Sequence, residues 1–364
     1  MQSCRRIGVE DGALRDRCGK SSRCLRRPRK SSKEQEMLIR SIYGGLILAA
    51  LCGPLFAADI RMGPTGDDQN DGSAGKPVAT LQRAVDLALS NPKARSEPMR
   101  VLVQQGTYRG QKVQIDGSKL VGELAIVGLG TEPADFPVFR GDGSKATWFT
   151  LKSDTGKPTG LTIQAIAVHD YFAAISLEGN REDRMAFNSG TTIRRNIFRN
   201  IGSATTHCDD CVSFAAILFY NSQNNLVENN FFGTIRNKRD KDCGSLHSIY
   251  LAHFSSDNRI VDNTFQDVCG SAIKLRDRSN NNRIEGNRFK EVQNAPAIEE
   301  WFCDADARKD CTKKSGECPS TGNVASGNDL SGSPGTQYIS IVGDRTPRAW
   351  CSAEDFARER MLSK

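Results

Sequence analysis

The stretch SSDNRIVDNTFQDVCGSAIKLRDRSNNNRIEGNRF, residues 255–289, contains one short pattern twice. An aliphatic residue is followed three positions later by Asn and two positions after that by Phe, first at 260–265 and again at 284–289. The two copies are 24 residues apart. Further copies are Ile193/Asn196/Phe198, Val227/Asn230/Phe232 and, more weakly, Ala325/Asn328/Leu330.

A second apolar pattern, which begins with Ile, lies between these copies. Its members start at Ile175, Ile217, Ile249, Ile273, Ile298 and Ile339, and the smallest spacings are 24 and 25 residues. Short strands that repeat at this period indicate a β-solenoid, in which each coil covers the apolar edge of its neighbour. Asn at a fixed place in each coil suits a tight turn. We therefore predict an asparagine ladder through Asn230, Asn263 and Asn287, and an aligned core column through Ile217, Ile249 and Ile273.

These coils resemble the right-handed parallel β-helix of pectate-lyase-like proteins. The opening segment GPTGDDQNDGSAGKPVATLQRAVDLAL, residues 63–89, is similar to the segment that begins many such proteins. The resemblance implies an all-β solenoid over residues 59–345, with an N-terminal helix that plugs the open end of the core and a tail or capping helix at 346–364. The helix carries its apolar residues at the spacing of one buried face. They are Leu81, Ala84, Val85, Ala88 and Leu89.

The charge of the chain is concentrated at its N-terminus. The 364-residue chain has a formal charge of +7, but residues 1–58 hold 12 of the 50 Lys and Arg and 5 of the 43 Asp and Glu. The remainder therefore has 38 residues of each sign and is neutral. This balance argues against a nucleic-acid partner that is attracted by net charge.

Residues 37–58, MLIRSIYGGLILAALCGPLFAA, have the layout of a secretory signal: Arg40, an apolar run, and small residues before Asp59. We expect cleavage after Ala57 or Ala58, a secreted or periplasmic protein, no stable membrane insertion after cleavage, and a monomer. A retained membrane anchor is the alternative. Residues 1–36 are interpreted as a basic unstructured extension or as a mis-assigned start.

Eight cysteines follow the predicted signal: Cys208, Cys211, Cys243, Cys269, Cys303, Cys311, Cys318 and Cys351. An even number behind a secretory signal predicts disulfides, with Cys208, Cys211, Cys243 and Cys269 oxidised among themselves. The alternative is a zinc site that joins Cys208 and Cys211 to His207 or His247. The acidic run at 67–71 is interpreted as an Asx-rich turn rather than a calcium loop.

Stacking of the Ile-initiated strands predicts two outward columns, because corresponding residues of adjacent coils lie about 4.8 Å apart. One column reads Ser176, Leu218, Tyr250, Lys274, Glu299 and Ser340, and the other reads Glu178, Tyr220, Ala252, Arg276, Trp301 and Val342. Cysteine-bearing insertions at 199–213, 234–246 and 303–320 flank this sheet, so we predict a groove between them. Glu300 falls on the inward side of its strand.

The residue types in these columns suit β-elimination on a uronate polymer. Arg276 would neutralise the substrate carboxylate, and its charge would lower the pKa of Lys274, a candidate base. Tyr250 would act as base or as acid to the leaving oxygen, with His247 as a further candidate. Predicted substrate-binding residues are Tyr220, His253, Glu299 and Trp301, because sugar rings stack on aromatic faces.

The stretch 255–289 also resembles β-helix lyases of the alginate-lyase and chondroitinase-B type, in which a K-S-x-x-N turn precedes an L-R motif one coil later. Leu275-Arg276 matches the second motif, whereas Phe254 stands where the lysine of the first would be. The resemblance implies an acidic polysaccharide as partner and a divalent cation such as Ca2+ as a cofactor. The departure at Phe254 leaves both the family's base and its calcium use open.

Two alternatives to a lyase remain. Asp209-Asp210-Cys211, His247 and Ile273-Lys274 occur in the order that polygalacturonase-type hydrolases show, and that resemblance would make Asp209 and Asp210 the acid and base. A uronate epimerase belongs to the same class of alternative. The other reading is a non-catalytic glycan-binding or envelope protein, since a charged outward face is also common on a solvated sheet.

Overall fold

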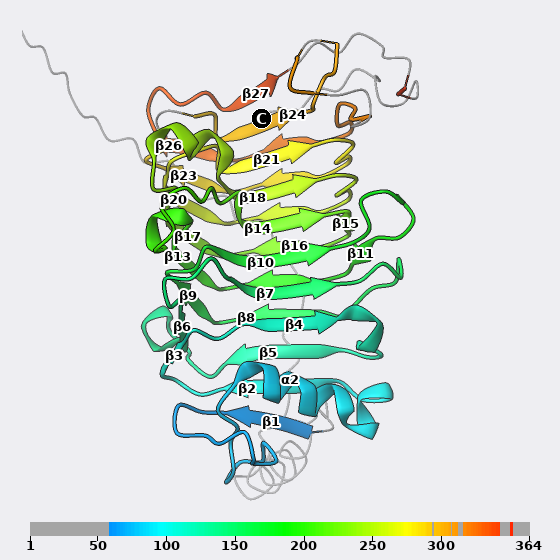
Figure 1. Cartoon of the computed structure of the whole chain (residues 1–364), viewed down its shortest axis with the longest axis vertical. Coiled ribbons are helices and arrows are strands. Elements are labelled where there is room, and N and C mark those ends of the chain that lie inside the picture. Colours follow the sequence, from blue (N-terminus) through cyan, green and yellow to red (C-terminus); the bar gives the residue numbers. More distant parts are fainter. Residues whose placement is uncertain (1–57, 293–294, 307, 312–315, 343–349, 352–364) are drawn as a thin grey trace, which may run out of the picture. The chain divides into compact units, whose positions relative to one another are not determined.

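The computed structural model describes residues 58–292, 295–306, 308–311, 316–342 and 350–351 (Figure 1). The predicted signal peptide, apart from Ala58, and most of the predicted C-terminal tail lie outside these residues. Within the described part of the chain, no helix is long and apolar enough to cross a membrane.

Three parallel sheets build the solenoid, and each full coil contributes one strand to each sheet. Sheet 1 contains β1 (Ala58–Met62), β2 (Met99–Val103), β5 (Leu124–Gly128), β8 (Leu161–Gln164), β12 (Thr192–Arg194), β16 (Leu226–Glu228), β19 (Arg259–Val261), β22 (Arg283–Glu285) and β25 (Val324–Ser326). Sheet 2 contains β3 (Thr107–Arg109), β6 (Val138–Arg140), β9 (Ala167–His169), β13 (Ile197–Ile201), β17 (Phe231–Ile235), β20 (Thr264–Val268), β23 (Arg288–Lys290) and β26 (Asp329–Gly332).

Sheet 3 carries the Ile-initiated strands. It contains β4 (Val113–Asp116), β7 (Thr147–Lys152), β10 (Ala173–Glu178), β14 (Ala215–Tyr220), β18 (His247–Ala252), β21 (Ile273–Arg276), β24 (Ile298–Trp301) and β27 (Ile339–Val342). A small pair joins β11 (Asn188–Ser189) to β15 (Ser222–Gln223). Short 3-10 turns are η1 (Pro92–Arg95), η2 (Gly117–Lys119), η3 (Pro133–Asp135), η4 (Ser203–Thr205) and η5 (Asp240–Ser245).

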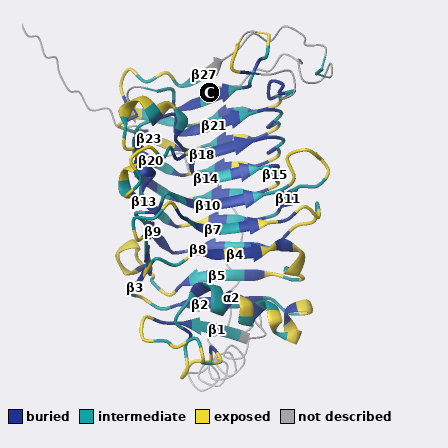
Figure 2. Cartoon of the chain, viewed as in Figure 1, coloured by how far each residue is buried: buried dark blue, intermediate teal, exposed yellow. Residues whose placement is uncertain are grey.

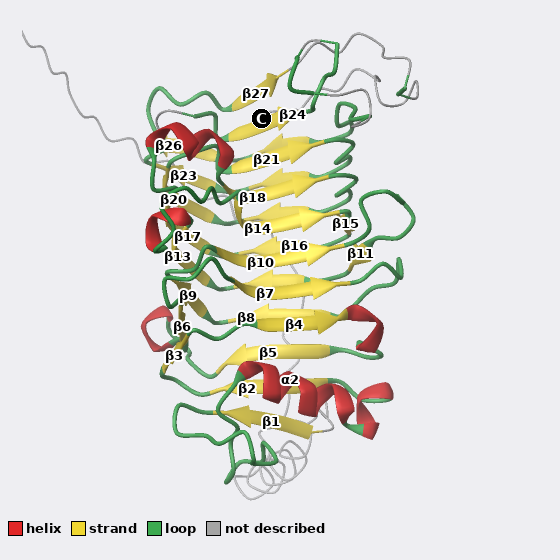
Figure 3. Cartoon of the chain, viewed as in Figure 1, coloured by secondary structure: helices red, strands yellow, loops and turns green. Residues whose placement is uncertain are grey.

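Helix α2 (Leu81–Ser90) lies beside β1 and β2, at the N-terminal end of the core (Figure 3). Its buried residues are Leu81, Ala84, Val85 and Ala88, with Leu89 partly buried against the same core. The Thr80 hydroxyl accepts a hydrogen bond from the Arg83 amide and so caps the first turn. The predicted plug helix is therefore confirmed.

The strands of the solenoid contain buried residues in coil after coil (Figure 2). Ile217, Ile249 and Ile273 face one another in register in sheet 3, as predicted. Behind the asparagines, four buried rings stack with centroids 5.0 to 5.1 Å apart: Phe198, Phe232, Phe265 and Phe289. Identical residues stack well because each coil repeats the backbone of the one before it.

The predicted asparagine ladder is also present. The side-chain amide of Asn230 donates to the side-chain oxygen of Asn263 at 3.0 Å, and that of Asn263 donates to Asn287 at 3.0 Å. Each oxygen also accepts the backbone N–H of the preceding asparagine, which satisfies a buried donor. A second ladder, which the sequence pattern did not reveal, runs through Asn225, Asn258, Asn282 and Asn323.

All eight cysteines after the predicted signal form disulfides: Cys208–Cys211, Cys243–Cys269, Cys303–Cys311 and Cys318–Cys351. The disulfide prediction is thus confirmed, and the alternative zinc site at Cys208 and Cys211 is wrong because both sulfur atoms are bonded. The Asx interpretation of 67–71 also holds. Asp68 accepts from the backbone of Ala79 and Thr80, and Asp71 accepts from Ser73.

Candidate functional site

Sheet 3 brings the predicted site residues together in the expected register. Tyr250 on β18 is paired with Lys274 on β21, which is paired with Glu299 on β24. In the second column, Arg276 is paired with Trp301. The columns follow from strand alternation, because Ile273 and Leu275 point into the core and the alternating Lys274 and Arg276 therefore point outward.

Lys274 is far less exposed than an ordinary surface lysine. Its side chain is 12% exposed, and its Nζ lies 3.2 Å from Glu299 Oε1. Aromatic rings flank the ammonium group, with the Trp301 centroid at 5.1 Å and the Tyr250 centroid at 5.9 Å. Burial lowers the pKa of Lys274, the Glu299 pair opposes this effect, and Arg276 adds a smaller lowering. The direction matches the prediction, but burial rather than Arg276 is the main cause.

Arg276 is already paired with a carboxylate of the same chain. Its Nε and Nη2 donate to the two oxygens of Glu317 at 2.9 and 2.6 Å, and Nη1 donates to the Tyr250 hydroxyl at 3.2 Å. Burial alone would lower the pKa of the guanidinium, but these bonds raise it above its usual value. All three nitrogens of the Arg276 guanidinium therefore already donate to groups of the same chain, two to Glu317 and one to Tyr250.

Tyr250 and His247 are both neutral in this environment. Burial raises the pKa of Tyr250, and the nearby Arg276 charge offsets part of that rise. Burial lowers the pKa of His247 to about 3, with the Lys274 charge as a further cause. His247 contacts the Ser271 carbonyl through Nδ1 at 3.0 Å, and its ring meets Tyr250 edge-on at 5.2 Å. Its buried Nε2 has no partner within the described residues.

Glu299 and Trp301 complete the cluster. Glu299 accepts a 2.9 Å hydrogen bond from the Ser271 hydroxyl in addition to its pair with Lys274. Trp301 lies against the Arg276 guanidinium at 4.6 Å from its ring centroid. Glu300, between them, is buried on the inward side of β24, as its position in the strand predicted.

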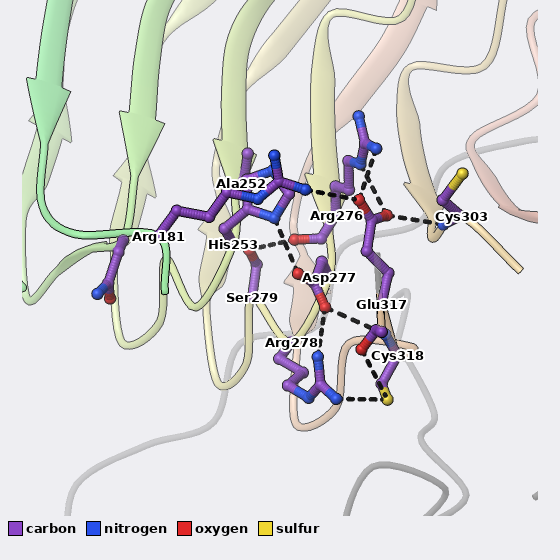
Figure 4. Close-up of polar contacts among 12 residues, drawn as sticks. Arg181, Ala252, His253, Arg276, Asp277, Arg278, Ser279, Cys303, Glu317 and Cys318 are labelled. Carbon is purple, nitrogen blue, oxygen red and sulfur yellow. Dashed lines mark hydrogen bonds and ion pairs between the residues drawn. The ribbon is translucent and has the colours of Figure 1, made fainter. Parts of the chain in front are cut away.

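A second polar cluster adjoins Arg276 (Figure 4). His253 Nδ1 lies 2.8 Å from Asp277 Oδ2, and Tyr220 meets the His253 ring edge-on at 4.9 Å. Arg276 links this cluster to Glu317, which also accepts from the Cys303 backbone at 2.7 Å.

His253, Asp277 and Glu317 are the group of possible metal ligands that the described residues contain, with ligand atoms within 4.8 Å of one another. Both carboxylates are occupied by arginines, since Arg278 binds Asp277 at 2.7 Å and Arg276 binds Glu317. Guanidinium groups at these positions repel a cation. The donor set therefore fits an internal ion-pair network better than a divalent metal.

Asp209 and Asp210 differ from this cluster in their exposure to solvent. Their side chains are 83% and 92% exposed, and they pair with Lys238 and Arg239 respectively. The hydrogen bond from Lys238 lowers the pKa of Asp209. A general acid needs a raised pKa, so these two carboxylates lack the environment that hydrolysis requires.

On sheet 3, where the groove was predicted, neighbouring side chains cover one another, and Tyr250 is only 8% exposed. Cavities of about 600 and 510 Å3 lie elsewhere, one beside the loops that follow β4 and β7 and one on sheet 2. Sequence reasoning missed Ser271, Asp277 and Glu317. Asp277 directly follows the repeat motif and could have been found from that position, whereas Glu317 lies in an insertion without a repeat.

Comparisons with known proteins agree with the architecture. The family described as "Right handed beta helix region" matches residues 156–308, less than half of the chain. A search of curated protein sequences finds no match.

Among solved structures, the catalytic domain of a GH87 alpha-1,3-glucanase in complex with nigerose has 14% identity and a TM-score of 0.45, covering 74% of this chain and 43% of that one. An alginate lyase from Paenibacillus sp. has 10% identity and a TM-score of 0.41, covering 73% and 97%. A Streptococcus pneumoniae surface protein and adhesin has 14% identity and a TM-score of 0.43, covering 79% and 80%. The chain thus spans less than half of the glucanase domain. Its three parallel sheets and the matched region identify the fold as a right-handed parallel β-helix.

Proposed function

We propose that this chain is a secreted or periplasmic carbohydrate-active protein that cleaves a uronate-containing polysaccharide by β-elimination. The observation that carries the proposal is Lys274, a largely buried lysine between two aromatic rings, next to a neutral phenol on the adjacent strand. The four disulfides support an extracellular or periplasmic location, because such bonds persist in oxidising compartments.

β-Elimination needs one group to remove a proton and another to protonate the leaving oxygen. Burial lowers the pKa of Lys274, so a larger fraction of its amine is neutral at working pH. The neutral amine can accept the proton from C5 of the uronate. The electron pair of that C–H bond forms the C4–C5 double bond, and the C4–O bond breaks. Tyr250 donates its proton to the departing oxygen, for which its raised pKa keeps it protonated.

Neighbouring residues hold these two groups in place. Arg276 donates to the Tyr250 oxygen, so the phenol proton remains free to point toward the substrate. Glu299 fixes the Lys274 amine, and Trp301 offers a ring for sugar stacking. His247, Tyr220 and His253 would line the same face. Because Glu317 and Tyr250 together accept from all three Arg276 nitrogens, neutralisation of the substrate carboxylate would rely on the second N–H groups of Nη1 and Nη2.

A non-catalytic glycan-binding function is the second candidate. It is favoured by the existing ion pairs, because Lys274 is already paired with Glu299 and Arg276 with Glu317, as in a structural network. Hydrolysis by Asp209 and Asp210 lacks comparable support. For either candidate we propose an acidic polysaccharide as partner, no nucleic acid, and a monomeric chain.

Incubation with a panel of uronate polymers tests the proposal. A lyase produces unsaturated chain ends that absorb in the ultraviolet, whereas a hydrolase produces reducing ends without that absorbance. Polymer retention with neither product would support the binding function. If no polymer in the panel is cleaved or retained, both candidate functions are wrong.

A further inference from the structure

A second cavity lies on sheet 2, on a different sheet from the site proposed above. It has a volume of about 510 Å3 and is lined by residues of β13, β17 and β20 and of the turns that precede these strands. Its apolar wall contains Phe136, Ile197 and Phe231. Its polar wall contains Arg195, Arg199 and Asp262. The volume falls within the range of small-ligand sites, about 300 to 1,000 Å3.

Phe231 is held flat against the sheet. A methyl group on Gly233 would lie 2.5 Å from Cε1 of Phe231. The Phe231 ring therefore fills the space that a side chain at position 233 would need. Arg199 is paired with Gly233 across the coils, and its guanidinium carbon lies 5.2 Å from the Phe231 centroid. An arginine that stacks on a ring keeps its in-plane N–H donors available for a planar anion.

The charges in the cavity favour an anion that also bears hydroxyl groups. Within the described residues, Arg199 and Asp262 form no ion pair, and Arg195 donates to the Thr131 carbonyl. Two arginines and one aspartate leave a net positive cavity. The guanidinium donors suit a carboxylate, the exposed Asp262 accepts from hydroxyls, and the apolar wall suits the C–H face of a sugar.

We propose that this cavity is a second saccharide site, which binds a carboxylate-bearing sugar unit of a polymer chain while the chain is engaged at sheet 3. Arg199 pairs with the carboxylate, Arg195 adds positive potential, and Phe231 with Ile197 contacts the ring. A site on a separate sheet increases retention of a long polymer through its effective concentration and leaves the binding of short pieces to each site independent.

The test measures affinity of the full chain for oligogalacturonate, for alginate oligomers and for a neutral maltooligosaccharide of equal length, by calorimetry and by retention in polymer-containing gels. Arg199→Ala and Phe231→Ser should each weaken binding of at least one uronate oligomer about tenfold or more, without affecting the neutral sugar. Arg236→Ala is the matched control. Arg236 is an exposed arginine beside the same sheet, but it pairs with Asp267 and does not line the cavity.

The outcomes separate this proposal from the function proposed for sheet 3. Unchanged affinity in the Arg199 and Phe231 variants, or no uronate binding by the unaltered chain, overturns the second site. If these variants lose retention while the chain forms no unsaturated product, the second site stands and elimination is wrong. A loss equal to that of Arg236→Ala would mean that only net charge had been measured, which also overturns the proposal.

Discussion

Two lysines on sheet 3 show how burial distinguishes a candidate base from a surface charge. Lys152 pairs with Glu178 at 3.4 Å with its side chain 71% exposed, whereas Lys274 pairs with Glu299 at 3.2 Å with its side chain 12% exposed. Both point outward from their strands and both face a glutamate on the adjacent strand. The difference lies in the rings of Tyr250 and Trp301, which exclude water from Lys274 alone.

Replacing Lys274 by alanine should abolish most turnover. Removal of a base costs about 100- to 10,000-fold in rate, whereas the lost pair with Glu299, which keeps its hydrogen bond from Ser271, should lower the free energy of unfolding by roughly 1 to 3 kcal/mol. Product formation on the uronate polymer and thermal unfolding measure the two effects. Lys152→Ala is the control and should change neither. Retained turnover in Lys274→Ala would remove this residue from the mechanism.

Arg276→Ala should be destabilising, although outward placement on a strand would suggest a neutral substitution. It leaves the fully buried carboxylate of Glu317 without its bidentate partner, which should cost roughly 3 kcal/mol of unfolding free energy. The double variant Arg276→Ala/Glu317→Gln removes the buried charge and should recover much of that loss in denaturant titrations. Equal stability of the single and double variants would show that the pair does not support the fold.

The buried neutral His247 makes stability depend on pH. Its folded pKa, about 3, is below the value of about 6.5 in the unfolded chain, so acid favours unfolding. Its contribution is complete above pH 6.5 and decreases as the pH falls toward 3, by roughly 1.4 kcal/mol per pH unit. His247→Gln should flatten the pH profile of unfolding in this window. The exposed His207→Gln should leave it unchanged, and a profile identical in all three proteins would contradict this assignment.

At the scale of elements, the turns determine how one coil is placed on the next. The residue before each ladder asparagine takes a left-handed backbone conformation, with φ of 54° at Asn229, 54° at Asp262 and 66° at Gly286. This conformation turns the chain sharply from sheet 1 into sheet 2. The asparagine that follows then holds the corner by bonding to the coils on both sides.

Asn263→Ala should therefore cost more stability than a surface amide. It removes the acceptor for the buried backbone N–H of Asn230 and the donor to the Val227 carbonyl. Each unsatisfied buried group costs about 1 to 3 kcal/mol, so a total of roughly 2 to 4 kcal/mol is expected in chemical denaturation. Gln266→Ala, on the outer face of the next strand, is the control. A loss below 1 kcal/mol would mean that neighbouring groups replace these bonds.

At the scale of the whole molecule, the regular part of the fold could be predicted from the sequence because each coil repeats one register. Ile249, Ile273 and Ile298 gave the spacing, and strand alternation then placed Lys274 beside Tyr250 and Glu299. The partner of Arg276 could not be predicted in this way. Glu317 lies in the insertion 303–320, whose path depends on tertiary contacts and on two disulfides rather than on a repeat.

Burial was the second quantity that the pattern could not supply. Alternation tells whether Lys274 points outward, but its exposure depends on Trp301 and on the insertion beside it. The sequence consequently predicted the correct direction of the Lys274 pKa shift with a minor cause in place of the main one. The same reasoning applies to the second cavity, since Phe231 and Arg199 are unremarkable outward residues until Gly233 allows the ring to lie flat.

Mature protein isolated under oxidising conditions should carry no reactive thiol among Cys208, Cys211, Cys243 and Cys269. Alkylation without reduction, followed by peptide mass spectrometry, should find these residues in the pairs 208–211 and 243–269. Reduction should lower the unfolding temperature, because the bridges restrict the unfolded chain. Alkylation at all four positions before reduction would contradict the pairing.

The asparagine ladder has an electrical consequence. From Asn196 to Asn287, every side-chain amide of the ladder donates to the amide of the following coil, so the carboxamide dipoles point the same way along the stack. Aligned dipoles polarise one another and strengthen each bond in the row. Their sum places partial positive charge at the C-terminal end, as unpaired N–H groups do at the start of a helix. At that end Nδ2 of Asn328, the final donor, donates a 2.6 Å hydrogen bond to the Tyr338 hydroxyl. The positive end of the row of dipoles therefore faces a phenol oxygen.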